Sequence, residues 1–282
     1  MSAAISPPDA AAPLERSRGV LRVRIARHGQ ASVLAGLYQE GCLKARFPSA
    51  LPGAPASIVL MNNAGGVASG DRLDSAVALG EGAAASVTSA GAERFYRRRP
   101  GDEAAHVTTQ ISLGAGAALE WLPQESILFE AASLDRTLSV EIADDAQFLA
   151  VEALLFGRAA MGEAVHRLDI VDRVRIRRAG RLVWHDTVRL AGDAASLLHH
   201  AAIGGGARAV AGILFVAPDA AMRLDALRQA LADGPCRAGA TFRDGVLFAR
   251  LLADDGAALR EGIAAGLAVL RADRMLPRNW RC

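Results

Sequence analysis

The sequence predicts an all-β body with a small helical part towards the C-terminal end. Through most of the first three quarters of the chain, apolar and polar residues alternate with a period of two, as they do over residues 21–25. This alternation is typical of strands that bury one face. Glycine-rich turns separate the alternating segments, and many short strands joined by such turns indicate sheets packed on sheets.

The same alternation identifies further strands along the chain. Val107 and Ile111 interleave with polar residues, and the pattern recurs from 134 to 142 and again from 173 to 177. After the last of these, residues 178–180 predict a turn into another strand. Within residues 117–127 an apolar strand ends at Pro123, between the carboxylates Glu120 and Glu125.

Two later stretches predict helices. Asp219 is a residue type that caps helix N-termini, and it precedes leucines with helical spacing, namely Leu224, Leu227 and Leu231. The run over residues 256–271 places four apolar side chains on one stripe, namely Leu259, Ile263, Leu267 and Leu270. Between these helices, residues 241–252 predict a hairpin around Asp244-Gly245.

Composition limits the organisation and the environment of the chain. At 282 residues with half of them apolar, the chain is long enough to bury a sizeable core. Residues 1–19 lack the basic and apolar regions of a signal peptide and predict a disordered leader, followed by a single domain over 20–282. The three cysteines, Cys42, Cys236 and Cys282, form no C-x-x-C pair, which argues against a disulfide framework or zinc site and favours a reducing, cytoplasmic compartment.

Charge and hydropathy exclude two kinds of partner. The net charge of +2 gives no overall nucleic-acid signature, so we expect no DNA or RNA binding. The most apolar window, residues 201–216, contains four glycines and an arginine and falls short of a membrane span.

Several motifs resemble catalytic or nucleotide-binding sequences only in part. Residues 65–70 have the glycine spacing of a P-loop, but Asp71-Arg72 follows where that motif needs lysine and a hydroxyl residue, so we expect a tight turn. Gly114-Ala-Gly116 lacks the third glycine of a dinucleotide-binding motif and predicts another turn. The chain has no Gly-x-Ser-x-Gly and no His-Glu-x-x-His sequence.

The acidic residues offer a second kind of signal. Six carboxylates lie in or beside apolar or glycine-rich stretches, where a charge is costly unless it is paired or hydrated: Asp71, Glu93, Glu120, Glu125, Glu152 and Glu163. One interpretation is that each pairs with a nearby arginine, such as Arg72, Arg94 or Arg158. The other is that several line a hydrated internal path for a divalent cation, since oxygen ligands bind such ions weakly and exchange them quickly.

An enzyme remains the alternative from another class. Glu120 and Glu125 bracket Pro123 and could serve as the acid and base of an all-β hydrolase or lyase. The histidines are less suited to metal binding, because the adjacent pair His199-His200, placed in a strand, would point to opposite faces. His106 and His166 alternate with apolar neighbours and are expected on the polar faces of strands. Cys282 could supply a thiolate, but it stands at the end of the chain.

Three segments together resemble a known family. They are residues 117–127, with Glu120-Trp-Leu-Pro-Gln-Glu125 at their centre, residues 62–71, Asn-Asn-Ala-Gly-Gly-Val-Ala-Ser-Gly-Asp, and residues 157–163, Gly-Arg-Ala-Ala-Met-Gly-Glu. The chain from about Val20 to Trp280 resembles the urease accessory protein UreD, also called UreH. This resemblance implies stacked β-sheets of β-helix or solenoid-like topology with two C-terminal α-helices.

The resemblance also implies a function. Proteins of this family are non-catalytic helpers that bind apo-urease and the accessory proteins UreF and UreG, and are thought to guide nickel to urease through a water-filled passage. We therefore expect no enzyme activity and no tightly bound cofactor, only transient Ni²⁺. Our hypothesis assigns Asp71 and Glu163 to the nickel path, with Glu120 and Glu125 as further candidates.

The family resemblance extends to a basic, aromatic segment over residues 93–99. Arginine and tyrosine are enriched at interface hot spots, so this segment could dock a partner, although a solvated loop is the plainer interpretation. At the other end, Pro277 and Trp280 could pin the C-terminal segment to the sheet body.

Overall fold

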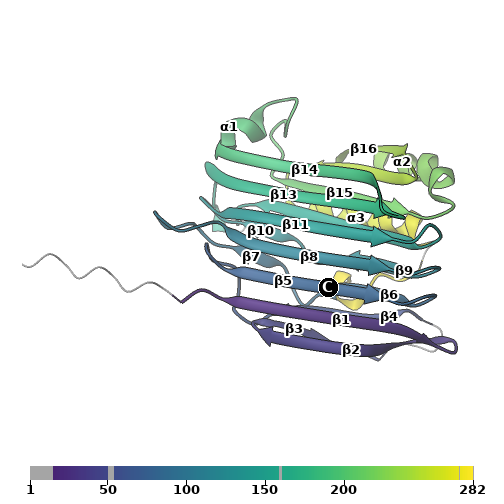
Figure 1. Cartoon of the computed structure of the whole chain (residues 1–282). Helices are drawn as coiled ribbons and strands as arrows, with labels where there is room; N and C mark the ends of the chain where they lie inside the picture. Colours follow the sequence, from purple (N-terminus) through teal and green to yellow (C-terminus); the bar gives the residue numbers. More distant parts are fainter. Residues whose placement is uncertain (1–14, 50–53, 159–160, 273, 282) are drawn as a thin grey trace, which may run out of the picture.

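The strands of the protein form two facing mixed sheets (Figure 1). The computed structural model describes residues 15–49, 54–158, 161–272 and 274–281. Within these residues the first sheet has seven strands in the order β14-β13-β11-β8-β5-β1-β2. Its strands are β1 (Arg18–His28), β2 (Ala31–Gly41), β5 (Arg72–Leu79), β8 (Ala105–Leu113), β11 (Ser133–Ile142), β13 (Arg167–Arg178) and β14 (Arg181–Asp193). Neighbours from β1 to β13 are parallel, and the pairs at both edges are antiparallel.

The second sheet follows the order β16-β17-β15-β12-β9-β6-β4-β3, and the short strands β7 and β10 extend it beside β12. Its strands are β3 (Leu43–Arg46), β4 (Ala56–Asn62), β6 (Ala84–Ser89), β7 (Glu93–Phe95), β9 (Ala118–Leu122), β10 (Ser126–Leu128), β12 (Gln147–Phe156), β15 (Ala209–Val216), β16 (Arg237–Arg243) and β17 (Val246–Ala253). The middle of this sheet, from β4 to β12, is parallel. Both flanks are antiparallel.

The chain crosses repeatedly between the sheets from β4 to β13. For example, β4 lies in the second sheet, β5 in the first and β6 in the second again. Strands that are neighbours in one sheet therefore come from successive crossings and run in the same direction. The turns at 65–70 and 114–116 fall between strands, as predicted, and Gly65, Gly70 and Gly116 all have positive φ.

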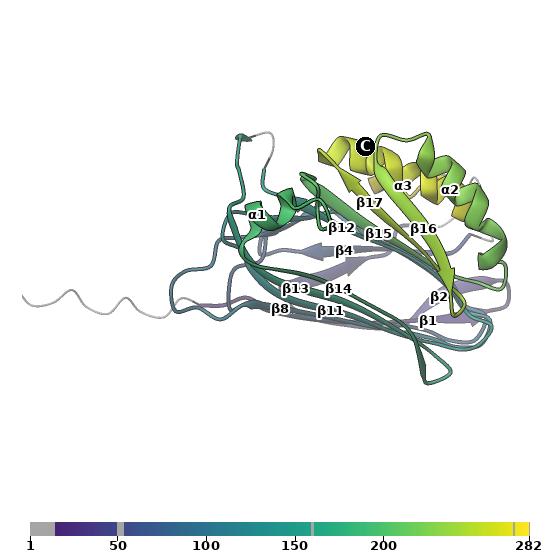
Figure 2. The same ribbon diagram turned by 90° about the horizontal axis from the view of Figure 1, so that it is seen from above.

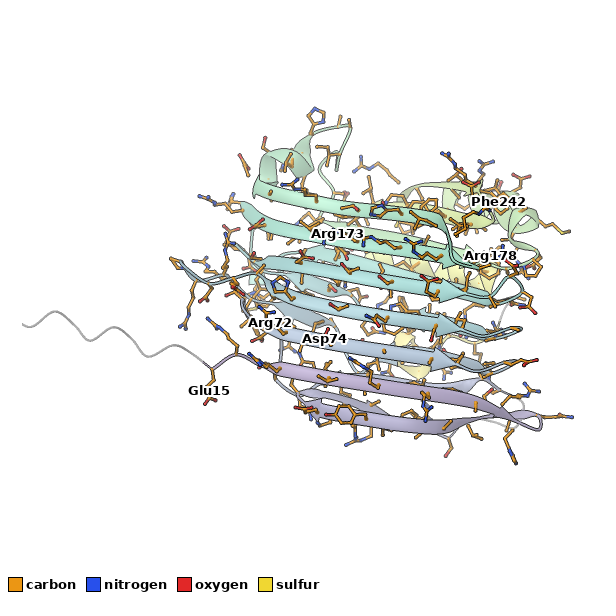
Figure 3. The ribbon with its side chains drawn as sticks, in the orientation of Figure 1. Glu15, Arg72, Asp74, Arg173, Arg178 and Phe242 are labelled. Atoms are coloured by element: carbon orange, nitrogen blue, oxygen red, sulfur yellow. The ribbon has the colours of Figure 1, made fainter. Side chains whose placement is uncertain are left out.

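Helices cover only one outer face of the two-sheet body in the described part of the chain. Figure 2 shows α2 (Leu224–Ala232) and α3 (Gly256–Leu270) on the face of the second sheet that points away from the first. The short helix α1 (Ala194–His199) lies beyond the end of β14, and there are 3-10 turns η2 (Ala220–Arg223) and η3 (Arg278–Trp280). The outer face of the first sheet carries polar side chains such as Arg72, Asp74 and Arg173 (Figure 3).

Two apolar cores follow from this layering. One lies between the sheets, where β1 contributes Leu21, Val23 and Ile25. The other lies between the second sheet and the helices, where α3 contributes the predicted stripe of Leu259, Ile263, Leu267 and Leu270. Strand β15 is buried throughout, because it faces both cores.

The strand-rich body and the C-terminal helices predicted from the sequence are confirmed, together with the hairpin at Asp244-Gly245, whose positive φ values suit a type I′ turn. The β-helix or solenoid-like topology is not confirmed: the sheets are mixed, and their outer pairs are antiparallel. The structure also contains α1, which the sequence did not predict.

Three local predictions differ from the structure. Asp219 does not cap α2, because the 3-10 turn η2 intervenes and the Asp219 carboxylate pairs with Arg223 at 2.6 Å instead. His199 and His200 lie at the end of α1 and not in a strand. Strand β1 takes in Arg18 and Gly19 from the predicted leader, whose residues 1–14 lie outside the described residues.

No helix in the described ranges is both long enough and apolar enough to cross a membrane.

Candidate functional site

A cavity of about 370 Å³ lies between the two sheets. Its walls mix apolar side chains of the inter-sheet core with polar ones, and the polar lining includes Asn62, Ser75, Glu93, Thr109, Gln124, Ser126, Arg136 and Glu152. Gln124 is buried, and its Nε2 donates to no other group among the described residues. Buried polar groups are normally hydrogen-bonded, so this cavity, which we call the main cavity, suits water or another polar occupant.

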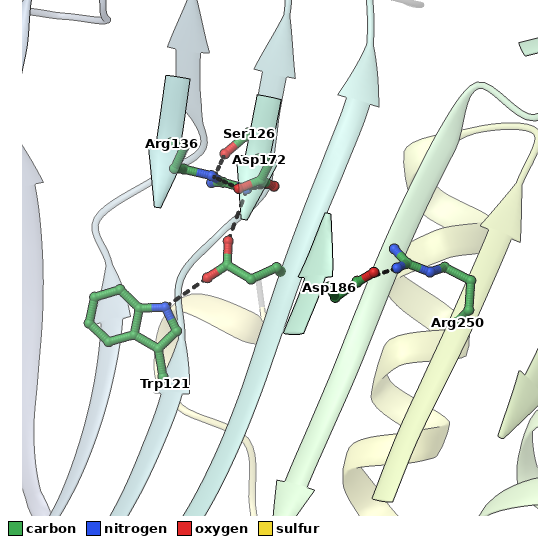
Figure 4. A network of polar contacts seen from close by, with 7 residues as sticks. Trp121, Ser126, Arg136, Asp172, Asp186 and Arg250 are labelled. Atoms are coloured by element: carbon green, nitrogen blue, oxygen red, sulfur yellow. Dashed lines mark hydrogen bonds and ion pairs between the residues drawn. The ribbon is translucent and has the colours of Figure 1, made fainter. Parts of the chain in front are cut away.

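The main cavity ends at a largely buried cluster of charged and polar side chains, whose contacts are drawn in Figure 4. We call Trp121, Ser126, Arg136, Glu152 and Asp172 the central cluster. The Arg136 guanidinium donates to both oxygens of Asp172, from Nε at 2.8 Å and from Nη2 at 2.6 Å. The same Nη2 lies 3.0 Å from Glu152 Oε2, and Nη1 donates to Ser126 Oγ at 2.8 Å. The Trp121 indole donates to the other Glu152 oxygen at 2.9 Å.

Strand alternation places these groups inside the molecule. Arg136 on β11 and Asp172 on β13 are paired in register, and both occupy positions that otherwise point apolar residues at the core. Glu152 takes the equivalent position on β12 in the opposite sheet. Arg136 therefore links a carboxylate of its own sheet to one of the facing sheet.

The central cluster carries more negative than positive charge. One guanidinium faces two carboxylates, which leaves a formal charge of −1. Burial raises the pKa of Glu152 above its ordinary value, Arg136 opposes that rise, and nearby Asp172 adds to it. Burial alone would lower the pKa of Arg136, but the attraction of Asp172 and Glu152 outweighs it and the pKa is raised. The Arg136 side chain therefore stays positively charged.

A second ion pair continues the row of charges towards solvent. Asp186 on β14 pairs with Arg250 on β17. Both line a small cavity of about 20 Å³ together with Glu152 and Asp172, which is room for about one water molecule. We call this the seam cavity, because β14 is the edge strand of the first sheet and β17 is next to the edge strand of the second.

At its other end, the main cavity reaches the loops that resemble family segments. Asn62 Nδ2 donates to Glu93 Oε2 at 3.2 Å, and Tyr96 donates to Gly65 O at 2.7 Å. A Cβ at Gly66 would lie 2.5 Å from the Tyr96 ring, so only glycine fits this position. The glycine-rich turn is thus packed against the basic, aromatic segment. In that segment Arg98 pairs with Asp169 at 2.9 Å, while the docking role proposed for the segment stays a prediction.

Asp71, the first predicted nickel ligand, is a buried carboxylate held by backbone amides. Its oxygens accept from Ser17 N and from Ala68 N, each at 2.8 Å. These bonds close the turn before β5 and fasten the chain that leads into β1. Arg72, the expected partner of Asp71, pairs with Glu103.

Glu163, the second residue predicted for the nickel path, pairs with an arginine. This agrees with the interpretation that such carboxylates pair with nearby arginines. Arg158 Nε lies 2.9 Å from Glu163 Oε2, and the same carboxylate accepts from the backbone N–H groups of Arg158 and Glu130. The side-chain hydrogen bond from Arg158 holds the pKa of Glu163 below its ordinary value. Residues 159–160, between these two partners, lie outside the described residues.

Glu120 and Glu125 have separate partners on the helix side of the second sheet. Arg271 donates to both oxygens of Glu120 at 3.0 Å, and Arg274 adds a contact of 2.7 Å. Glu125 pairs with Arg260 at 2.9 Å. Both carboxylates form ion pairs with arginine side chains. This arrangement does not favour their use as the acid and base of a hydrolase or lyase.

Metal-ligand chemistry is sparse in the described part of the chain. It contains no group of three or more His, Cys, Asp or Glu side chains placed to hold a metal ion. Cys42 and Cys236 are free thiols, and Cys282 lies outside the described residues.

Sequence reasoning missed most of the central cluster. It singled out Glu152, but not its partners Arg136 and Asp172. A signal was present in two of the alternating strands, where one inward position carries a charge: Leu134, Arg136, Leu138 in β11 and Ile170, Asp172, Val174 in β13. An ionisable residue in phase with the buried face of a strand must have a partner, so two such residues of opposite sign predict a buried pair.

The fold and the site together define a class of strand-rich protein: two facing mixed sheets, one covered by helices, with a charge-lined cavity between them. The sequence matches the model of the UreD urease accessory protein family over residues 17–281. It is 42% identical to the urease accessory protein UreD of Paracoccus denitrificans, over 97% of this chain and 96% of the relative. It is 42% identical to UreD 2 of Methylorubrum populi, over 95% and 91%, and 38% identical to UreD of Brucella suis, over 95% of each. The chain belongs to the UreD family of urease accessory proteins.

Proposed function

We propose that this protein binds apo-urease together with UreF and, through that complex, UreG, and that nickel reaches the urease active site through the main cavity. Nickel is the cargo and not a resident cofactor, and the chain itself performs no reaction. Family membership supports the accessory role. The observation that supports the route is the cavity of about 370 Å³ that leads from the family loops to the central cluster.

The chemistry of the lining suits a passing divalent cation. Glu93, Ser75 and Thr109 offer oxygen ligands along the cavity, and Glu152 offers another at its inner end. Oxygen ligands of this kind bind nickel weakly and exchange it quickly, whereas a cluster of thiolates or imidazoles would retain it. The nickel-path role predicted for Asp71, Glu163, Glu120 and Glu125 stays a prediction, and the structure gives each of them a structural partner.

Two further parts belong to the same proposal. The protein acts in the cytoplasm, where the free thiols of Cys42 and Cys236 would stay reduced. The solenoid-like topology also stays part of the proposal: it is supported by the repeated crossing of the chain between the sheets from β4 to β13, and the main cavity lies between those sheets.

The test is a side chain that fills the cavity. Thr109 on β8 lines the main cavity, and Thr108 beside it points to the opposite face of the same strand. We expect Thr109→Trp to abolish nickel loading and Thr108→Trp to preserve it. The variants are expressed with a urease operon that lacks its own UreD gene. Urease nickel content, activity, subunit levels and recovery of the accessory complex are then measured.

Three outcomes separate the parts of the proposal. Normal nickel content in cells without the gene would exclude a maturation role. Normal loading by Thr109→Trp, with the complex recovered at the usual level, would exclude the main cavity as the route. Failure of both variants to assemble with urease would show only damage to the fold, and smaller substitutions at Thr109 would then replace tryptophan.

A further inference from the structure

The central cluster separates two cavities. Arg136 and Glu152 form the inner wall of the main cavity, while Glu152 and Asp172 line the seam cavity on the other side. Glu152 belongs to both walls. The guanidinium of Arg136 is bonded to both carboxylates (Figure 4), and it therefore lies between the two cavities that these residues line.

Exposure increases from this partition towards the seam. The side chains of Asp172 and Arg136 are 7% and 14% exposed, whereas those of Asp186 and Arg250 are 28% and 31% exposed. The charges thus form a row from the inside of the molecule to the edge where β14 and β17 face each other. A route that continued past Arg136 would reach solvent, or a docked partner, at this edge.

We propose that Arg136 is a gate in the nickel route, and that a divalent cation opens it by replacing the guanidinium between Glu152 and Asp172 and then leaves past Asp186 and Arg250. This inference rests on the proposed function, since it concerns the same cavity. With Arg136 in place, a cation entering from the main cavity meets the positive charge of the guanidinium at a largely buried position, where charges are screened less than in bulk water. The bidentate bond from Arg136 to Asp172 makes the closed state the resting state.

The exchange balances in charge. Two carboxylates carry −2, which matches a divalent cation once the guanidinium has moved aside. The released guanidinium keeps a partner on the main-cavity side, because Ser126 already accepts from its Nη1. Glu152 stays oriented by the Trp121 indole during the exchange. Two carboxylates without a third ligand bind a divalent ion only weakly, as a transit point requires.

A charge-matched double variant removes the gate. Arg136→Met with Asp172→Asn deletes one positive and one negative charge, so the cluster keeps its formal charge of −1, and the amide oxygen introduced at position 172 still faces the gap. The matched control is Arg173→Met with Asp135→Asn, which removes an ion pair joining the same two strands on the outer face of the sheet. Both are expressed with the urease operon over a series of nickel concentrations.

We expect urease nickel content to become half-maximal at a nickel concentration roughly threefold or more below the concentration that the wild type needs. The reason is that in the gate variant the cation no longer spends free energy on displacing the Arg136 guanidinium. The control should match wild type. An unchanged or higher half-maximal concentration at normal recovery of the complex would overturn the gate. If the double variant fails to assemble, Arg136→Lys is tested in its place. Lysine keeps the positive charge but cannot form the bidentate contact with Asp172, so the half-maximal nickel concentration should fall by a smaller factor. An Arg136→Lys variant with the wild-type half-maximal concentration would then overturn the gate.

The cavity-filling variant distinguishes this inference from the proposed function. If Thr109→Trp blocks loading and the gate variant behaves as wild type, the route stands and the gate is wrong. If Thr109→Trp loads nickel normally, the route itself has failed, whatever the gate variant shows.

Discussion

Asp71 is a buried carboxylate and Glu152 a largely buried one, and their partners decide what each can do. Asp71 accepts from two backbone amides that belong to separate segments, which ties it to the fold. Glu152 is held by side chains, Trp121 and Arg136, that can change rotamer without unfolding a strand. A carboxylate bound by side chains in a hydrated cavity can exchange partners, whereas one bound by backbone amides is expected to stay in place.

The first prediction concerns Asp71. Its replacement by alanine leaves Ser17 N and Ala68 N without their acceptor, and we expect the free energy of unfolding to fall by about 1–3 kcal/mol. Asp71→Asn keeps one acceptor oxygen and should cost less. Chemical denaturation of the purified accessory complex measures both. An Asp71→Ala complex that is as stable as wild type but delivers no nickel would instead support the nickel-path hypothesis.

The second prediction concerns pH and Glu93. Burial raises the pKa of Glu93, while hydrogen bonds from Asn62 and from the Arg94 backbone partly oppose the rise. The folded protein therefore binds this proton more tightly than the unfolded chain. The resulting stability is present below the ordinary glutamate pKa and is lost as pH rises through the raised value. Glu93→Gln, which cannot ionise, should thus gain in melting temperature relative to wild type between about pH 4 and pH 7.

Thermal unfolding across that pH range provides the measurement. Glu103→Gln is the control, since the Glu103 side chain is 72% exposed in a surface ion pair, and it should follow the wild-type profile. A constant difference between Glu93→Gln and wild type at every pH would show that burial of Glu93 does not govern the effect.

At the scale of elements, the period-two pattern was enough to predict β1, β8, β11 and the β13–β14 hairpin, because each buries one face. The pattern could not supply their partners. Parallel strands that alternate between two sheets pair with segments far along the chain. The local sequence pattern does not identify these pairing partners. The central cluster was missed for the same reason: Arg136 and Glu152 meet only because their sheets face each other.

Helix α3 gives the third prediction, which depends on its close approach to the second sheet. A Cβ at Gly262 would lie 2.6 Å from Cys236 Sγ and 3.1 Å from Leu251 Cδ2. We expect Gly262→Ala to destabilise the protein by about 1–3 kcal/mol through overpacking, although alanine is the better helix former. Glu261→Ala, at the exposed neighbouring position, should stay within about 0.5 kcal/mol of wild type. Denaturant titration compares the two, and a stabilised Gly262→Ala would show that the helix can move away from the sheet.

At the scale of the whole molecule, one flank of the first sheet is left open. Strand β2 is an edge strand, and four of its large apolar side chains are more than 40% exposed: Val33, Leu34, Leu37 and Tyr38. Glu40 is the one charged residue in this strand. Exposed apolar edge strands are sites of association with other chains, so this flank is where self-association of the free protein should begin.

The fourth prediction follows from that flank. Leu37→Lys should raise the amount of monomer recovered from the protein expressed without partners, because a charge on an edge strand opposes strand pairing. Size-exclusion chromatography with light scattering measures the monomer fraction. Leu182→Lys, on the edge strand at the opposite flank, is the comparison and should raise it less. Equal gains from both would point to a general effect of charge on solubility.

The contacts of Arg271, Asn279 and Trp280 also determine when the fold can be completed during synthesis. Arg271 holds Glu120, Trp280 donates to Leu122 O and Asn279 donates to Ser89 O, across sequence separations of 151, 158 and 190 residues. During synthesis β6 and β9 leave the ribosome long before these partners exist. Until Arg271 emerges, Glu120 is a charge without its arginine, so we expect the nascent chain to expose an aggregation-prone strand and to depend on chaperones until its C-terminal contacts form.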